Sequence, residues 1–177
     1  MKPAGVAVKQ TVHYQRLVKG LKTLVKKDVL VGIPADEGGR DTDINNAQLG
    51  YIHENGAPDV GIPARPSLFP GIRDAKDPIA KYLGVAAKAL INGKESKADQ
   101  ALHAAGMLAV SAVQSRIRRG DGFAPLKPST IRRRRIRSRG SKYRRKAISA
   151  SQVTPLIDTG QFIRAFTYIV RKGGAAE

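Results

Sequence analysis

The feature that most constrains the fold of this chain is a dense run of positive charge between Arg132 and Lys146. Ten of these fifteen residues are Lys or Arg, and none is acidic. Burying unpaired cations is strongly unfavourable, so this segment cannot form a hydrophobic core. It must face water, a polyanion or an acidic protein surface. The ten cations are Arg132, Arg133, Arg134, Arg135, Arg137, Arg139, Lys142, Arg144, Arg145 and Lys146.

The charge of the whole chain is concentrated around this run. Residues 116–146 hold fourteen basic side chains and one acid, Asp121, and therefore carry +13 of the net +18. A chain this basic is expected to meet nucleic acid or an acidic partner. A solvated basic loop without a partner is the alternative explanation.

Length and composition limit the protein class. The 177 residues fit one domain, and with few aromatic residues the core must be built from Ala, Val, Leu and Ile. The chain has no Cys, which excludes disulfides, thiolate metal sites and a Cys nucleophile. No apolar run approaches the roughly 18 residues of a membrane span, and the N-terminal residues lack the apolar stretch expected of a signal peptide. We therefore expect a protein made in the cytoplasm, without a membrane partner.

The periodicity of apolar residues predicts an α+β fold. Three long segments show helical spacing, and two β-branched runs are typical of strands. A shorter helix is expected from an N-cap at Asp43 to a C-terminus at Asn55-Gly56. We expect a small mixed or antiparallel sheet, with one or two further strands, packed by long helices in a single domain of residues 1–177. The expected long helices are 13–27, 79–90 and 98–119, and the expected strands are 29–33 and 163–171.

The basic run lies inside a long connection, residues 120–155, between the last long helix and the C-terminal strand. Connections of this length are uncommon in compact domains and are usually functional or disordered. We therefore predict an extended basic arm. Because its cations repel one another, residues 132–146 are expected to be mobile in the free protein and ordered against a polyanionic surface.

A second unusual segment, residues 57–72, contains four prolines and two glycines. This composition predicts mostly irregular structure. Pro63 and Pro66 restrict the backbone around Arg65, so the sequence predicts a stiff, exposed strip from which Arg65 projects. The strip is either an interface or a plain connector that orients the next helix.

His53 and Glu54 are adjacent titratable residues near the end of the expected short helix. Zinc peptidases of the corresponding pattern need a second His four residues after the first, but position 57 is Ala57. A metal site is therefore not expected, and the pair should cap or pack at the helix end or contact a subunit. We find no catalytic constellation, so we expect no catalytic, cofactor or metal residues and no enzyme activity.

Several segments, read in order, resemble one known family. The chain contains VLVGIP (29–34), NNAQLGYIHENGAP (45–58) and IPARPSLFPGI (62–72). An Ala-rich helical segment follows, then PLKPSTIRRR (125–134) and PLIDTGQF (155–162). Together these segments resemble the tailed-bacteriophage virion morphogenesis, or tail-completion, family.

The resemblance implies a structural protein of the phage head-to-tail interface, located in the neck or tail of the virion. It implies a closed ring, expected to be a hexamer, with tail terminator and head-closure proteins as neighbours and non-specific contact with packaged DNA. A tail terminator ring and a basic nucleic-acid-binding protein unrelated to virions stay open as alternatives. The candidate interface residues are His53, Glu54, Pro63, Arg65 and Pro66.

Overall fold

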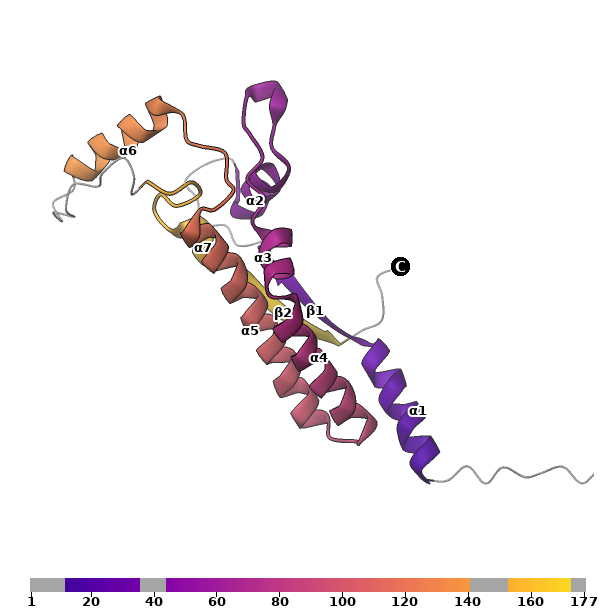
Figure 1. Cartoon of the computed structure of the whole chain (residues 1–177). Coiled ribbons are helices and arrows are strands. Elements are labelled where there is room, and N and C mark those ends of the chain that lie inside the picture. Colours follow the sequence, from indigo (N-terminus) through magenta and orange to yellow (C-terminus); the bar gives the residue numbers. More distant parts are fainter. Residues whose placement is uncertain (1–11, 36–43, 141–152, 173–177) are drawn as a thin grey trace, which may run out of the picture. The chain divides into compact units, whose positions relative to one another are not determined.

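The computed structural model describes residues 12–35, 44–140 and 153–172 (Figure 1). Helices dominate, and a small two-stranded antiparallel sheet packs against long helices, which confirms the α+β fold. Within these residues the sheet gains no third strand, so the expectation of one or two more strands is not met there. The elements are α1 (Val12–Val25), β1 (Lys27–Gly32), α2 (Asn46–Asn55), η1 (Pro58–Val60), α3 (Leu68–Asp74), α4 (Lys76–Ile91), α5 (Glu95–Arg119), α6 (Pro128–Gly140), α7 (Gln161–Arg164) and β2 (Thr167–Lys172).

The chain divides into two compact units. Unit 1 comprises residues 1–30, 77–106 and 169–177, and unit 2 comprises residues 31–76 and 107–168. The long helix α5 contributes its first half to unit 1 and its second half to unit 2. The expectation of a single domain stays a prediction.

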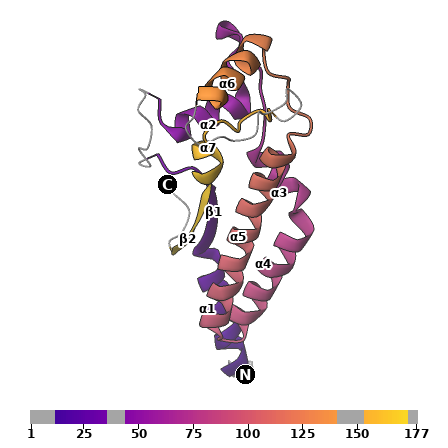
Figure 2. The same cartoon turned by 90° about the vertical axis from the view of Figure 1, so that its left-hand side faces the viewer.

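Unit 1 is built on small side chains. Helix α4 and the first half of α5 form a helical hairpin, visible in Figures 1 and 2. The alanine-rich face predicted for α5 is buried against alanines of α4, as close helix packing requires. A Cβ at Gly20 of α1 would lie 2.6 Å from the carbonyl oxygen of Leu90, so α1 also approaches closely. The buried hydrophobic cluster consists of Ala86, Ala89, Leu90, Ala98, Ala101 and Leu102.

Unit 2 has a core of larger side chains. Two of its aromatic rings, Phe162 and Phe166, meet edge to face with centroids 5.3 Å apart. Helix α3 packs tightly on α5, since a Cβ at Gly71 would lie 2.9 Å from the Cα of Val113. The buried cluster is Val113, Ile117, Leu156, Phe162, Ile163 and Phe166.

The start of α2 differs from the prediction. Its N-cap is Asn45 rather than Asp43, which lies outside the described residues. The Asn45 side chain accepts a hydrogen bond from the Gln48 N–H at 2.8 Å, and the Gln48 side chain accepts one from the Asn45 N–H at 3.0 Å. This reciprocal capping box decides the helix start. The predicted end is confirmed at Gly56, whose φ is 78°.

Two segments expected to lack regular structure contain helices. Residues 68–74 form α3, where Pro70 lies in the first turn and interrupts no helical hydrogen bond. Residues 128–140 form α6, which begins at Pro128, a position that favours proline. The expectation that residues 128–140 lack regular structure is therefore wrong, because arginine is itself a good helix former. The basic arm itself stays a prediction. The expectation of mobility for residues 141–146 falls outside the described residues.

Candidate functional site

One pocket of unit 2 brings together the motif segments that lie far apart in the sequence. Its volume is about 240 Å³. Helix α2, the Pro-rich strip, the PLKPSTIRRR segment and the PLIDTGQF segment all contribute to its walls. The lining residues are Leu49, His53, Arg65, Leu126, Arg134, Leu156, Asp158, Thr159, Gly160 and Phe162.

Arg65 does not project from the surface. It is only 7% exposed, and its guanidinium donates from Nε to the Ala124 carbonyl at 2.8 Å and from Nη2 to the Pro125 carbonyl at 3.0 Å. The prediction of an exposed Arg65 is therefore wrong. Loop carbonyls at 124–125 have no helix or sheet to supply donors, and the planar guanidinium bonds both at once.

Arg134 of α6 is the second arginine of the pocket. Its Nη1 donates to the carbonyls of Thr154 at 3.2 Å and Ile157 at 2.8 Å. Its Nε lies 3.9 Å from the Asp158 carboxylate. Arg134 thus holds α6 to the segment that follows the basic run.

The ten cations of the predicted basic arm therefore do not behave alike. Arg132 and Arg133 are exposed on α6, whereas Arg134 turns inward. Arg135, Arg137 and Arg139 belong to α6, but the structure describes only their backbone. Residues 142–146, with the other four cations, lie outside the described residues.

The electrostatics of the pocket are dominated by its two arginines. Burial lowers the pKa of the Arg65 guanidinium below its ordinary value, and the positive charge of Arg134 lowers it further. The hydrogen bonds that Arg65 makes to carbonyls do not cancel its charge. Asp158 is the one carboxylate among the pocket's described lining residues.

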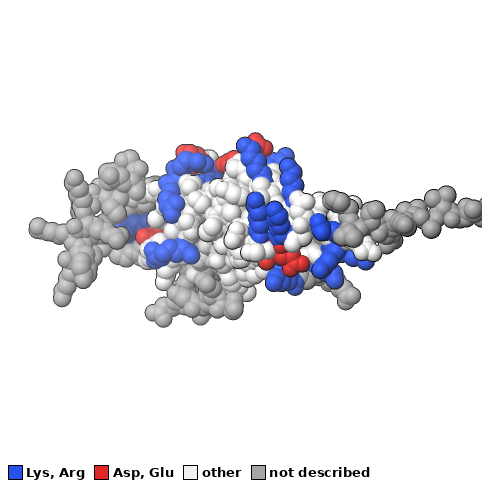
Figure 3. Space-filling view, turned by 90° about the horizontal axis from the view of Figure 1, so that it is seen from below, with Lys and Arg blue, Asp and Glu red and all other residues white. Residues whose placement is uncertain are grey.

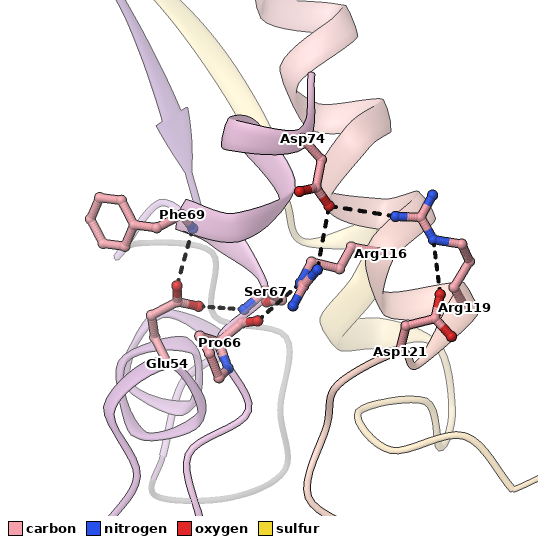
Figure 4. Close-up of polar contacts among 8 residues, drawn as sticks. All are labelled: Glu54, Pro66, Ser67, Phe69, Asp74, Arg116, Arg119 and Asp121. Atoms are coloured by element: carbon pink, nitrogen blue, oxygen red, sulfur yellow. Dashed lines mark hydrogen bonds and ion pairs between the residues drawn. The ribbon is translucent and has the colours of Figure 1, made fainter. Parts of the chain in front are cut away.

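Glu54 organises the backbone at the start of α3, as Figure 4 shows. Its carboxylate accepts hydrogen bonds from the N–H groups of Ser67 at 2.7 Å, Leu68 at 3.0 Å and Phe69 at 3.1 Å. Capping was expected at the end of Glu54's own helix, but the carboxylate caps the start of a different helix, α3. The N–H groups at the start of a helix carry partial positive charge and have no acceptor within the helix. A carboxylate is negatively charged, and its two oxygens can accept all three hydrogen bonds.

The other predicted interface residues have separate positions. His53 packs edge-on against Phe162, with ring centroids 5.4 Å apart. Pro63 is exposed. Pro66 is half-buried, and its carbonyl accepts a hydrogen bond from Arg116 Nε at 3.3 Å (Figure 4).

Sequence reasoning missed a charge network at the end of α5. Asp74 of α3 lies 3.3 Å from Arg116 and 3.6 Å from Arg119, and Arg119 also reaches Asp121 at 3.4 Å (Figure 4). Arg116 and Arg119 are one helical turn apart, so the sequence could have predicted that they lie on the same face of a helix. It could not have predicted Asp74 as their partner, because more than forty residues separate Asp74 from Arg116 in the sequence.

Other candidate sites are weaker. Two larger and more open hollows of about 500 and 320 Å³ lie along α1 in unit 1, with walls that include Lys19 and Thr23. Among the described residues, no three His, Cys, Asp or Glu side chains gather as a metal site would require. The described helices include none with the length and apolar character of a membrane span.

The surface is visibly basic. In the face drawn in Figure 3, Lys and Arg side chains outnumber Asp and Glu. Most of the described Asp and Glu side chains form an ion pair or accept hydrogen bonds from backbone N–H groups. For example, the Asp28 carboxylate lies 2.9 Å from Arg171 Nη2. Comparison with known proteins adds no assignment: no family model, no curated protein and no solved structure matches this chain.

Proposed function

We propose that this protein is a non-catalytic structural component of the phage head-to-tail interface, acting in the neck or in tail completion as a closed ring of identical subunits. One observation carries the proposal. Four segments on which the family resemblance depends, spread between residues 45 and 162, surround a single pocket of unit 2. If the segments of a family pattern form one structural feature, their residues are expected to lie close together in the fold.

The chemistry of these residues supports a structural role. Glu54, Arg65 and Arg134 each bond the backbone of another segment. Such contacts hold loops in one conformation, which reduces the entropy lost when the loops bind a partner. The expected partners are copies of the chain and the neighbouring tail terminator and head-closure proteins of a virion.

Exposed apolar side chains offer contact area for such partners. Tyr51 of α2, Val60 of η1 and Phe69 of α3 are 72%, 68% and 74% exposed. Exposed aromatic residues on firmly held elements are typical of binding surfaces. All three residues lie in unit 2, and Tyr51 belongs to a helix that lines the pocket, which supports an interface in this unit.

Nucleic-acid binding stays as the second candidate, because a specific observation favours it. Arg132 and Arg133 are exposed on α6, within a chain of net charge +18. Exposed cations on a helix bind phosphates without reading sequence. The same residues would account for non-specific contact with DNA inside a neck.

Negative-stain electron microscopy of the purified full chain, with sedimentation velocity, tests the proposal. Closed rings, expected to contain six subunits, would support it. The Phe69→Ser variant should weaken ring formation while preserving the fold, and Met107→Ser, which removes an exposed apolar side chain of α5, is the control. A protein that stays monomeric and binds duplex DNA with a steep salt dependence would favour the second candidate.

A further inference from the structure

We infer that the unit 2 pocket binds a carboxylate side chain supplied by another polypeptide, held between Arg65 and Arg134. Both arginines line the pocket and are fixed by hydrogen bonds to loop carbonyls. A carboxylate entering there would meet N–H donors already oriented by the protein. Each guanidinium carries five N–H donors, and Arg65 and Arg134 each use two of them for these carbonyls, so further donors are left for a carboxylate.

Among the described lining residues, the charges of the pocket are unbalanced without such a ligand. Arg65 and Arg134 bring two positive charges, and the only described acid on the wall, Asp158, is 41% exposed and 3.9 Å from Arg134 Nε. A charge removed from water is unfavourable unless it is paired. One additional carboxylate would balance the charges of Arg65, Arg134 and Asp158.

The remaining walls favour a protein carboxylate over a nucleic-acid phosphate. Leu126, Leu156 and Phe162 are apolar and would contact the carbon atoms of an acidic side chain. A phosphate backbone would instead need an open row of cations, as Arg132 and Arg133 on α6 offer. Asp158 would also repel a phosphate dianion more strongly than a monoanionic carboxylate.

Two sources of the carboxylate are consistent with this chemistry. A second copy of the chain carries Asp59 on the exposed turn of η1, beside the exposed Val60, and the described residues give Asp59 no ion pair. Another protein is the other source. The binding of a carboxylate does not depend on the proposed function, whereas the second-copy source rests on the proposed ring.

The binding test uses side-chain Nε–H NMR signals of arginine in the full chain. The probes are N-acetyl-aspartate methylamide, its neutral asparagine analogue and inorganic phosphate. The aspartate probe should produce saturable shifts at Arg65 and Arg134, and the asparagine analogue none. Arg132 and Arg133 are internal controls for non-specific ion effects. Shifts at the pocket arginines no larger than those at the controls, or tighter binding of phosphate than of the aspartate probe, would overturn the inference.

Two variants distinguish a loss of carboxylate binding from a loss of folding. Arg134→Met should abolish saturable binding, but it also removes bonds to Thr154 and Ile157 and could unfold α6. Asp158→Asn is milder and acts in the opposite direction: removal of the resident acid should tighten binding of the aspartate probe about two- to fivefold. Unchanged or weaker binding by a folded Asp158→Asn protein would contradict a carboxylate site.

The source is decided by self-association of the full chain. If a second copy supplies the carboxylate, Asp59→Asn should weaken association in sedimentation velocity, and the probe should compete with it. Asp77→Asn, which changes an exposed acid of unit 1, is the control. Normal association of Asp59→Asn, with intact probe binding, assigns the carboxylate to another protein. Absence of rings with intact probe binding would contradict the proposed function alone.

Discussion

Units 1 and 2 are held together by different kinds of contact. In unit 1, alanines of α4 and α5 interlock, and Gly20 lets α1 approach Leu90. In unit 2, Phe162 and Ile117 fill the core, but polar side chains also fasten loops to one another. The helices of unit 1 satisfy their own backbone groups, whereas the loops of unit 2 need donors and acceptors from side chains.

This difference explains where the unusual residues of the sequence lie. Glu54 and Arg65 have long polar side chains that reach backbone groups 13 to 60 residues away. Their removal should therefore damage unit 2 more than loss of a surface charge would. Unit 1 should instead be most sensitive to added volume, because its helices are already in close contact.

The largest effect is expected from Glu54→Ala. The substitution leaves three N–H groups at the start of α3 without their acceptor, and Ser67 is only 2% exposed. Hydrogen bonds to a charged group contribute about 1.5–3 kcal/mol each at most, so we expect a loss of about 3–4 kcal/mol in the free energy of unfolding. Urea titration measures it. Asp121→Ala, which removes an exposed ion pair, is the control and should cost less than about 1 kcal/mol.

Arg65→Met should lower the free energy of unfolding by about 2–3 kcal/mol, because the carbonyls of Ala124 and Pro125 lose their donors. Methionine keeps much of the apolar stem, so the loss reports mainly on the guanidinium. Arg132→Met at an exposed position of α6 is the matched control. If the two variants were equally stable, the hydrogen bonds of Arg65 would contribute no more to stability than an exposed arginine does.

Glycine substitutions test the close packing of unit 1. A Cβ at Gly20 would meet the Leu90 carbonyl at 2.6 Å, so Gly20→Ala should destabilise the protein by about 1–3 kcal/mol. Gly84 lies in α4 with no atom within 4 Å of its added Cβ, and Gly84→Ala should be neutral or stabilising by up to about 1 kcal/mol. Thermal unfolding of both variants checks this; a stabilising Gly20→Ala would refute the close approach of α1.

The smallest effect on stability is expected from the double variant Arg132→Ser and Arg133→Ser. Both side chains are exposed, so the free energy of unfolding should change by less than about 0.5 kcal/mol per site. Binding to duplex DNA, followed by fluorescence anisotropy at several salt concentrations, should lose about two units of salt slope if these cations contact phosphates. Arg134→Ser should show the reverse pattern, with lost stability and a smaller change in salt slope.

Several helices could be predicted from the sequence, because their signals are local. The apolar spacing predicts α1, α4 and α5 nearly to their ends, and helix termini at Gly56 and Gly120 follow from glycines that adopt φ of 78° and 72°. Prediction from the sequence failed where a local pattern is compatible with two different structures. The charge run excluded a buried core but did not distinguish an arm from helix α6, since arginine permits both.

Which polar side chains turn inward could be seen only in the three-dimensional structure. Arg132, Arg133 and Arg134 are identical neighbours in the sequence, yet only Arg134 meets the Ile157 carbonyl, because the rotation of α6 directs that position toward the pocket. Arg65 reaches carbonyls 59 and 60 residues away, and Glu54 reaches the start of another helix. These hydrogen-bond partners depend on which loops the fold brings within hydrogen-bond distance. The spacing of residues along the chain does not predict which loops those are.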